Sequence, residues 1–184
     1  LSEIPENCFF YACGLGYHSL YLNGNRIALD DWMTPPFTSY HKRCCYTAHT
    51  DLQKLLHIGK NVIGMVIAPG WRRNEGEYLK ATGGREIPFM GRPCFTAVLE
   101  LFGKNGKHAR ICADEKWEST RGAIVQTNIF QGETYDARNE IPHWCTPEMA
   151  YGTGCRLAEP PAKAYAMELQ KLEPVQIGKR YRPQ

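Results

Sequence analysis

The sequence predicts an all-β domain, a sandwich of antiparallel sheets in a jelly-roll arrangement, with one short helix. Runs of strand length, either alternating or continuously apolar, recur between residues 8 and 136. Two Asn-Gly pairs mark tight hairpin turns. Strands do not alternate with helices of 10–15 residues, which argues against a parallel β-α-β fold.

The clearest hairpin is expected at residues 17–29. Residues 17–22 alternate, so Leu20 and Leu22 share one face of a strand and the tyrosines share the other. Asn23-Gly24 supplies the turn, because both central positions of such a turn need a positive φ. Residues 26–29 are then expected to return antiparallel.

The remaining elements follow in order. Residues 50–56 predict a short helical turn capped by Thr50 or Asp51, and Asn105-Gly106 predicts a second hairpin. Residues 61–68 form a continuous apolar run, which predicts a central strand. Other strands are expected at residues 8–13, 43–50, 95–102, 108–113, 117 onward, 123–128 and 130–136.

Two segments lack this strand pattern. Residues 71–92 are rich in glycine and predict a long loop, the kind of loop that often carries function. After Ile141 several prolines interrupt the chain. The sequence therefore predicts one domain over residues 1–160, followed at 161–184 by a linker or the start of another β domain.

Composition excludes several classes of function. The net charge is only +3, and the basic excess gathers near the C-terminus without a basic stripe, so no nucleic-acid partner is expected. No apolar run approaches 18 residues, so no membrane partner is expected either. The N-terminal residues lack a basic segment followed by an apolar one, so they do not predict a signal peptide.

Eight cysteines raise the question of disulfides or a metal. None has C-x-x-C spacing, so a zinc ribbon is not expected. In the cluster His41, Cys44, Cys45 and His49, the adjacent cysteines would point to opposite faces of a strand and could not converge on one ion. Buried free thiols and a bacterial cytoplasmic location are favoured, and two or more disulfides remain an alternative.

The sequence offers candidate residues for glycoside hydrolysis and, separately, for sugar binding. Glu133 and Asp136 are the most suggestive carboxylates, but their spacing places them on opposite faces of a strand, which does not suit glycoside hydrolysis. Trp71 lies at the mouth of the long loop beside Arg72 and Asn74, where an aromatic ring could stack on a sugar. Core packing explains Trp71 equally well.

The ordered motifs resemble those of a known family, the N-terminal domains of bacterial α-L-rhamnosidases of glycoside hydrolase family 78 type. Gly132 to Arg138, G-E-T-Y-D-A-R, resembles the most specific block of that family. The other matching blocks are G-Y-H-S-L-Y-L-N-G at 16–24, T-D-L at 50–52, G-K-N-V-I-G at 59–64 and Gly70-Trp71.

This resemblance implies a galactose-binding-like jelly roll that precedes a separate (α/α)₆ catalytic domain. In some relatives such a domain binds rhamnose with the help of calcium. Here His41-Lys42 stands where those relatives carry oxygen ligands, and a hard cation needs several oxygens. No cofactor is therefore expected, and calcium is the one candidate.

Three functional hypotheses follow. The first is a non-catalytic accessory domain whose partner is the catalytic domain of the same parent glycoside hydrolase. The second is a carbohydrate-binding module for L-rhamnose or a related sugar, and the third is independent catalysis by this chain. The contacts expected for the second are Trp71, Arg72, Asn74, Asn128, Glu133 and Tyr135.

Overall fold

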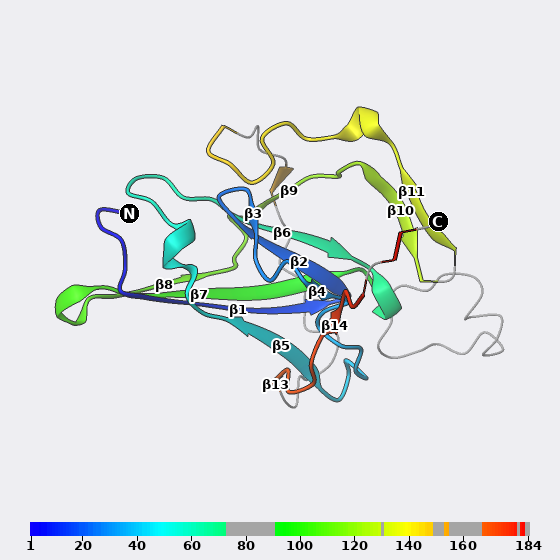
Figure 1. Cartoon of the computed structure of the whole chain (residues 1–184), viewed down its shortest axis with the longest axis horizontal. Helices are drawn as coiled ribbons and strands as arrows, with labels where there is room; N and C mark the ends of the chain where they lie inside the picture. Colours follow the sequence, from blue (N-terminus) through cyan, green and yellow to red (C-terminus); the bar gives the residue numbers. More distant parts are fainter. Residues whose placement is uncertain (73–90, 130, 149–152, 155–166, 180, 183–184) are drawn as a thin grey trace.

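The computed structural model is built almost entirely of short strands, which confirms the predicted all-β class (Figure 1). It describes residues 1–72, 91–129, 131–148, 153–154, 167–179 and 181–182. Within these residues, four single turns of 3₁₀ helix connect the strands: η1 (Leu52–Leu55), η2 (Gly70–Arg72), η3 (Lys104–Gly106) and η4 (Ala137–Asn139). No helix in the described ranges is both long and apolar enough to cross a membrane.

The larger sheet has five strands in the order β13-β5-β1-β7-β8. Its centre is β1 (Asn7–Leu15), which pairs antiparallel along its whole length with β7 (Cys94–Phe102). The other three strands are β5 (Cys44–His49), β8 (His108–Cys112) and β13 (Met167–Leu169). The predicted second hairpin is confirmed, because β7 and β8 pair antiparallel across Lys104–Gly106.

The smaller sheet has the order β3-β2-β6. The hairpin of β2 (Tyr17–Leu22) and β3 (Asn25–Arg26) is confirmed, with Leu20 and Leu22 buried on the same face. The prediction of a central strand at 61–68 was wrong, because β6 (Ile63–Ala68) lies at the edge of this sheet. Trp144 and Cys145 pack against Gly64 and cover this part of the edge strand.

The main core lies between these two sheets. Phe10 and Leu99 enter it from the larger sheet and Leu22 from the smaller one, all almost fully buried. The predicted helical turn at 50–56 is the 3₁₀ helix η1, and its Leu52 closes one end of this core. Asp51 precedes η1 with φ 58° and makes no side-chain cap, so the expected capping hydrogen bond does not form.

Three two-stranded ribbons lie outside this sandwich. They are β4 (Asp31–Trp32) with β14 (Val175–Gln176), β9 (Glu118–Ser119) with β12 (Thr153–Gly154), and β10 (Ile124–Asn128) with β11 (Gly132–Tyr135). The C-terminal strands β13 and β14 thus pair with β5 and β4 of the first half of the chain. The boundary predicted at residue 160 falls outside the described residues and stays a prediction.

Candidate functional site

The chain turns sharply where β6 ends, and four aromatic side chains gather there. Gly70 has φ +51°, and a Cβ at this position would lie 3.0 Å from the Tyr17 ring, so the close approach requires glycine. The next residue, Trp71, is half-buried. Its ring centroid is 5.7 Å from that of Phe37, which in turn is 5.6 Å from that of Tyr40. We call these four residues, Tyr17, Phe37, Tyr40 and Trp71, the aromatic corner.

Hydrogen bonds and burial restrict the side chains of the aromatic corner. The Trp71 indole donates a hydrogen bond to the Tyr17 hydroxyl, and burial raises the pKa of Tyr17. Tyr40 is buried, and loss of hydration raises the pKa of its hydroxyl to about 12. Phe37 is 40% exposed. Phe37 and the half-buried Trp71 and Tyr17 are therefore the members of the corner whose rings a ligand could reach.

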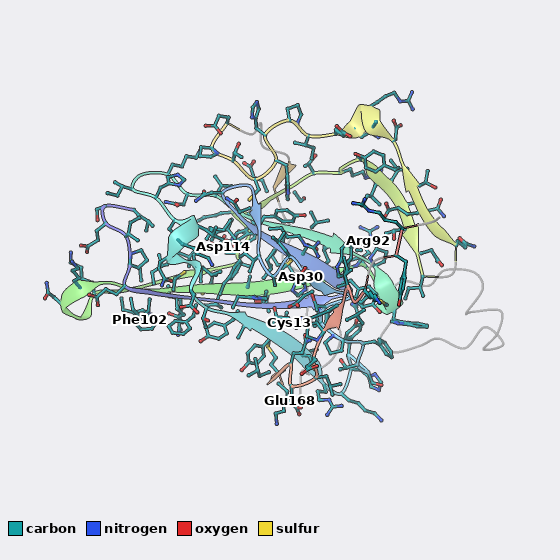
Figure 2. The ribbon with its side chains drawn as sticks, in the orientation of Figure 1. Cys13, Asp30, Arg92, Phe102, Asp114 and Glu168 are labelled. Atoms are coloured by element: carbon teal, nitrogen blue, oxygen red, sulfur yellow. The ribbon has the colours of Figure 1, made fainter. Side chains whose placement is uncertain are left out.

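Arg72 lies under the corner and not on the surface. Only 6% of the residue is exposed, and its Nε donates a hydrogen bond to the Arg92 carbonyl at 3.2 Å. Its guanidinium lies 6.0 Å from the Tyr40 ring centroid, and a Cβ on Gly91 would meet Nη2 at 2.8 Å. Arg72 thus joins the end of β6 to the segment entering β7, close to the labelled Arg92 in Figure 2.

Three other predicted contacts come from the β10–β11 hairpin. The Asn128 carboxamide oxygen accepts a hydrogen bond from the backbone of Gln131 at 3.2 Å, which stabilises the turn. Glu133 and Tyr135 are exposed and share one face of β11. The Tyr135 hydroxyl donates to Glu140 at 2.5 Å.

The structure therefore groups the candidates by element, with Trp71 and Arg72 in one group and Asn128, Glu133 and Tyr135 in the other. Asn74 lies outside the described residues. Sugar contact by any of them stays a prediction. Sequence reasoning missed the grouping of Tyr17, Phe37 and Tyr40 with Trp71, because these residues come from distant segments of the chain.

A second polar feature lies on the core side of the smaller sheet. His18 and His49 line a small cavity together with Arg26 and Asp31. His18 is buried, and neither of its ring nitrogens has a hydrogen-bond partner in the described part of the chain. Burial, helped by the charge of His49, lowers the pKa of His18 to about 4. The alternation of β2 could have revealed this residue, since His18 shares the buried face with Leu20 and Leu22.

The sequence also raised one cluster as a candidate metal site: His41, Cys44, Cys45 and His49. Cys44 is buried while Cys45 is only partly so, as expected for neighbours on a strand. Within the residues that the structure covers, no three histidine, cysteine or acidic side chains are placed to hold an ion together.

Comparisons with known proteins agree with this architecture. A family model described as the α-L-rhamnosidase N-terminal domain matches residues 3–179. An α-L-rhamnosidase of Formosa agariphila is 32% identical over 145 residues, which cover 78% of this chain and 15% of the relative. One from Streptomyces avermitilis is 34% identical over 138 residues, covering 74% and 13% of the two chains.

Solved structures give the same result. The crystal structure of Streptomyces avermitilis α-L-rhamnosidase complexed with L-rhamnose matches with a TM-score of 0.84 and 29% identity, over 95% of this chain and 16% of that chain. The structure of α-L-rhamnosidase from Dictyoglumus thermophilum matches with a TM-score of 0.76 and 29% identity, over 92% and 17%. The chain thus spans about one sixth of the relatives it matches, and it belongs to the α-L-rhamnosidase N-terminal domain family.

Proposed function

We propose that this chain is a non-catalytic accessory domain of an α-L-rhamnosidase-like glycoside hydrolase. It supports the catalytic part of the longer protein and shapes substrate access to it. The observation that carries this proposal is a surface of apolar side chains on the β4–β14 ribbon. The matched relatives are much longer than this chain, which is consistent with a partner of this kind.

The ribbon places its apolar side chains next to one another. Val175 is paired directly with Trp32, and the neighbouring Gln176 side chain donates a hydrogen bond to the Asp31 carboxylate at 3.2 Å. Trp32, Met33 and Val175 are 44%, 51% and 57% exposed. Ile177 and Leu29, near the same ribbon, are also exposed.

Exposed apolar groups that adjoin in this way mark surfaces that another protein surface covers. Interfaces between domains of one chain resemble transient protein–protein interfaces and leave each domain with its own core. The Arg26 guanidinium lies 4.8 Å from the centroid of the Trp32 ring and holds this ring at the surface. We therefore assign the ribbon to contact with the catalytic part.

The contacts of Asp136, one of the two carboxylates singled out from the sequence, support a non-catalytic role. Hydrolysis of a glycoside generally requires two carboxyl groups that can reach the scissile bond, one of which exchanges a proton. The carboxylate of Asp136 is held in a bidentate ion pair by Arg138, at 2.7 and 2.8 Å, and this contact lowers its pKa. Asp136 is thus kept ionised, which does not suit a proton donor.

The test is hydrolysis of p-nitrophenyl α-L-rhamnopyranoside by the 184-residue chain. We expect no release of nitrophenol above the rate in buffer alone at concentrations of this chain up to the micromolar range. Release that is proportional to the amount of chain, and that a Glu133→Gln variant loses, would establish independent catalysis and overturn the proposal.

A second candidate function is carbohydrate binding at the aromatic corner. The partly exposed rings of Phe37 and Trp71 favour it, because such rings stack on the apolar faces of sugars. One matched structure is described as a complex with L-rhamnose. Titration calorimetry of this chain with L-rhamnose, with and without calcium, separates the two candidates. Saturable heat that Trp71→Ala removes would favour the binding module, and no heat at millimolar sugar favours the accessory domain.

A further inference from the structure

Three cysteines lie on one face of the five-stranded sheet, next to the aromatic corner. Cys13 and Cys44 are buried in a small cluster with Leu15 and Tyr40, and Cys94 packs against it. Cys13 belongs to β1, Cys44 begins β5, and Cys94 begins β7. Figure 2 labels Cys13 on β1, the strand that lies between β5 and β7 in this sheet.

Strand register explains why Cys13 and Cys44 meet. The antiparallel pairing of β1 with β5 includes Ala12 opposite Thr47. Continued toward Leu15, this register sets Cys13 opposite Tyr46 and Cys44 opposite Leu15. The two cysteines are therefore diagonal neighbours on adjacent strands and share one face of the sheet.

The two thiols are in direct contact. The Cys13 thiol donates a hydrogen bond to the Cys44 sulfur, and the Cys44 thiol in its neutral form donates to the Tyr40 carbonyl at 3.5 Å. The Cys13 hydrogen bond and the charge of Arg72 lower the pKa of Cys44 to about 7. The same hydrogen bond and burial raise the pKa of Cys13. One thiol is therefore prepared to ionise while its neighbour keeps its proton.

We propose that Cys13 and Cys44 form a redox-active pair that hydrogen peroxide converts to a cross-strand disulfide. Peroxide suits this site because it is small and uncharged, whereas both sulfurs are enclosed, with only 5% of Cys13 and 7% of Cys44 exposed. Buried free cysteines are usually inert, but this pair combines a charged neighbour with a thiol partner in contact.

The chemistry balances in two steps. The Cys44 thiolate attacks one peroxide oxygen, the O–O bond breaks, and Cys44 becomes a sulfenic acid while hydroxide leaves. The Cys13 sulfur then attacks the sulfenic sulfur, the S–O bond breaks, and the Cys13 proton joins the departing hydroxide as water. Two thiols and one peroxide give one disulfide and two waters.

The neighbouring cysteine provides a matched control. Cys45 follows Cys44 directly in β5, but it points to the other face of the strand and burial raises its pKa. It therefore shares the local sequence and the strand of Cys44 and is somewhat more exposed, but it does not face Cys13. Cys112 on β8 is exposed and reports general surface oxidation.

The experiment treats the reduced 184-residue chain with peroxide, blocks the remaining thiols under denaturing conditions, and digests the chain with trypsin without reductant. Cleavage after Arg26, Arg43 and Lys54 places Cys13 in peptide 1–26 and Cys44 in peptide 44–54. We expect these peptides to be linked, with fragment ions that assign the bond to Cys13 and Cys44, and to separate when dithiothreitol is added.

Two serine variants complete the test. Cys45→Ser is expected to keep the linked peptide at the yield of the parent chain, and Cys44→Ser is expected to lose it. Retention of the link in Cys44→Ser would assign the bond to Cys45 and overturn the proposal. Peroxide treatment of the parent chain that oxidises Cys112 but yields no linked peptide would also overturn it, whether or not the Cys44→Ser variant folds.

Discussion

The sandwich and the outer ribbons of this domain differ sharply in how their side chains are used. In the inner strands of the sandwich, β1, β2 and β7, Phe10 and Leu22 are at most 1% exposed. In two of the outer ribbons, β4 with β14 and β10 with β11, many side chains are exposed; Val125 and Tyr135, for example, are 54% and 55% exposed. Figure 1 shows the β10–β11 hairpin as a separate arm outside the paired sheets.

The buried side chains of the sandwich stabilise the fold, whereas the exposed side chains of the ribbons form surface that another protein segment could contact. The block at 132–138, which carries the family resemblance most specifically, lies in an outer ribbon and η4. Its side chains are exposed except for the half-buried Asp136. Packing of the core therefore cannot explain this block, whereas contact with another part of a longer protein can.

The largest expected effect is loss of a core side chain. Phe10→Ala should lower the free energy of unfolding by about 3–5 kcal/mol, because the ring fills the space between the two sheets. Val125→Ala on the outer hairpin should change it by less than about 0.5 kcal/mol. Urea unfolding of both variants measures this contrast, and costs within about 1 kcal/mol of each other would contradict it.

Two glycines test the same contrast through the backbone. Gly16 and Gly132 have φ values of +123° and +77°. A Cβ on Gly16 would lie 2.2 Å from the Ala68 carbonyl oxygen, whereas a Cβ on Gly132 meets nothing within 4 Å. Gly16→Ala should cost about 3 kcal/mol or more, and Gly132→Ala about 1–2 kcal/mol from backbone strain alone. Equal unfolding midpoints for the two variants would refute the contrast.

Acid should destabilise the sandwich through His18. The unfolded chain binds a proton near pH 6.5 and the folded chain only near pH 4, so stability is complete above pH 6.5 and falls as the pH drops toward 4. Between pH 7 and pH 5 the loss should be about 2 kcal/mol from this residue. His49, whose pKa burial also lowers, adds to the loss in the same direction.

The control for this pH effect is an exposed histidine. His18→Gln should flatten the dependence of unfolding free energy on pH, whereas His57→Gln, at the surface, should leave the dependence as it is in the parent chain. If the parent chain has the same free energy of unfolding at pH 5 and pH 7, protonation of His18 does not destabilise the fold, which would contradict the prediction.

The smallest effect is expected in the outer ribbons. Asp136 caps η4 by accepting from the Arg138 backbone at 3.1 Å, and it also pairs with the Arg138 side chain. Asp136→Ala should shift the Arg138 amide resonance while leaving the urea midpoint unchanged, because this turn adds little to the global fold. A clear fall in the midpoint would mean that the outer hairpin is part of the cooperative unit.

The sequence predicted local structure well where one residue pattern decides it. Leu20 and Leu22 alternate with polar neighbours, and Asn23-Gly24 turns the chain, so the first hairpin followed from local rules. The C-terminal strands β13 and β14 lie in residues 161–184, where the sequence predicted a linker or the start of another β domain. Their partners could not be found, because pairing of β13 with β5 and of β14 with β4 depends on contacts between distant segments.

The candidate site was predicted less completely for the same reason. Trp71 was selected from its loop, but its packing against Phe37 is set by how the segment before β5 folds over the end of β6. Arg72 was selected from the sequence as a carbohydrate contact, and its burial was not predicted. It is buried because the Arg92 carbonyl and the Tyr40 ring, both remote in sequence, surround its guanidinium.

Hydrogen exchange followed by mass spectrometry tests the central claim most directly, because it reads the stability of every described strand in one chain. The amides of β1, β2 and β7 should exchange only through global unfolding and should be the slowest in the molecule. Those of β10, β11 and β14 should exchange orders of magnitude faster. Equal protection in the two sets would contradict a stable sandwich that carries ribbons free for contact with the rest of a longer protein.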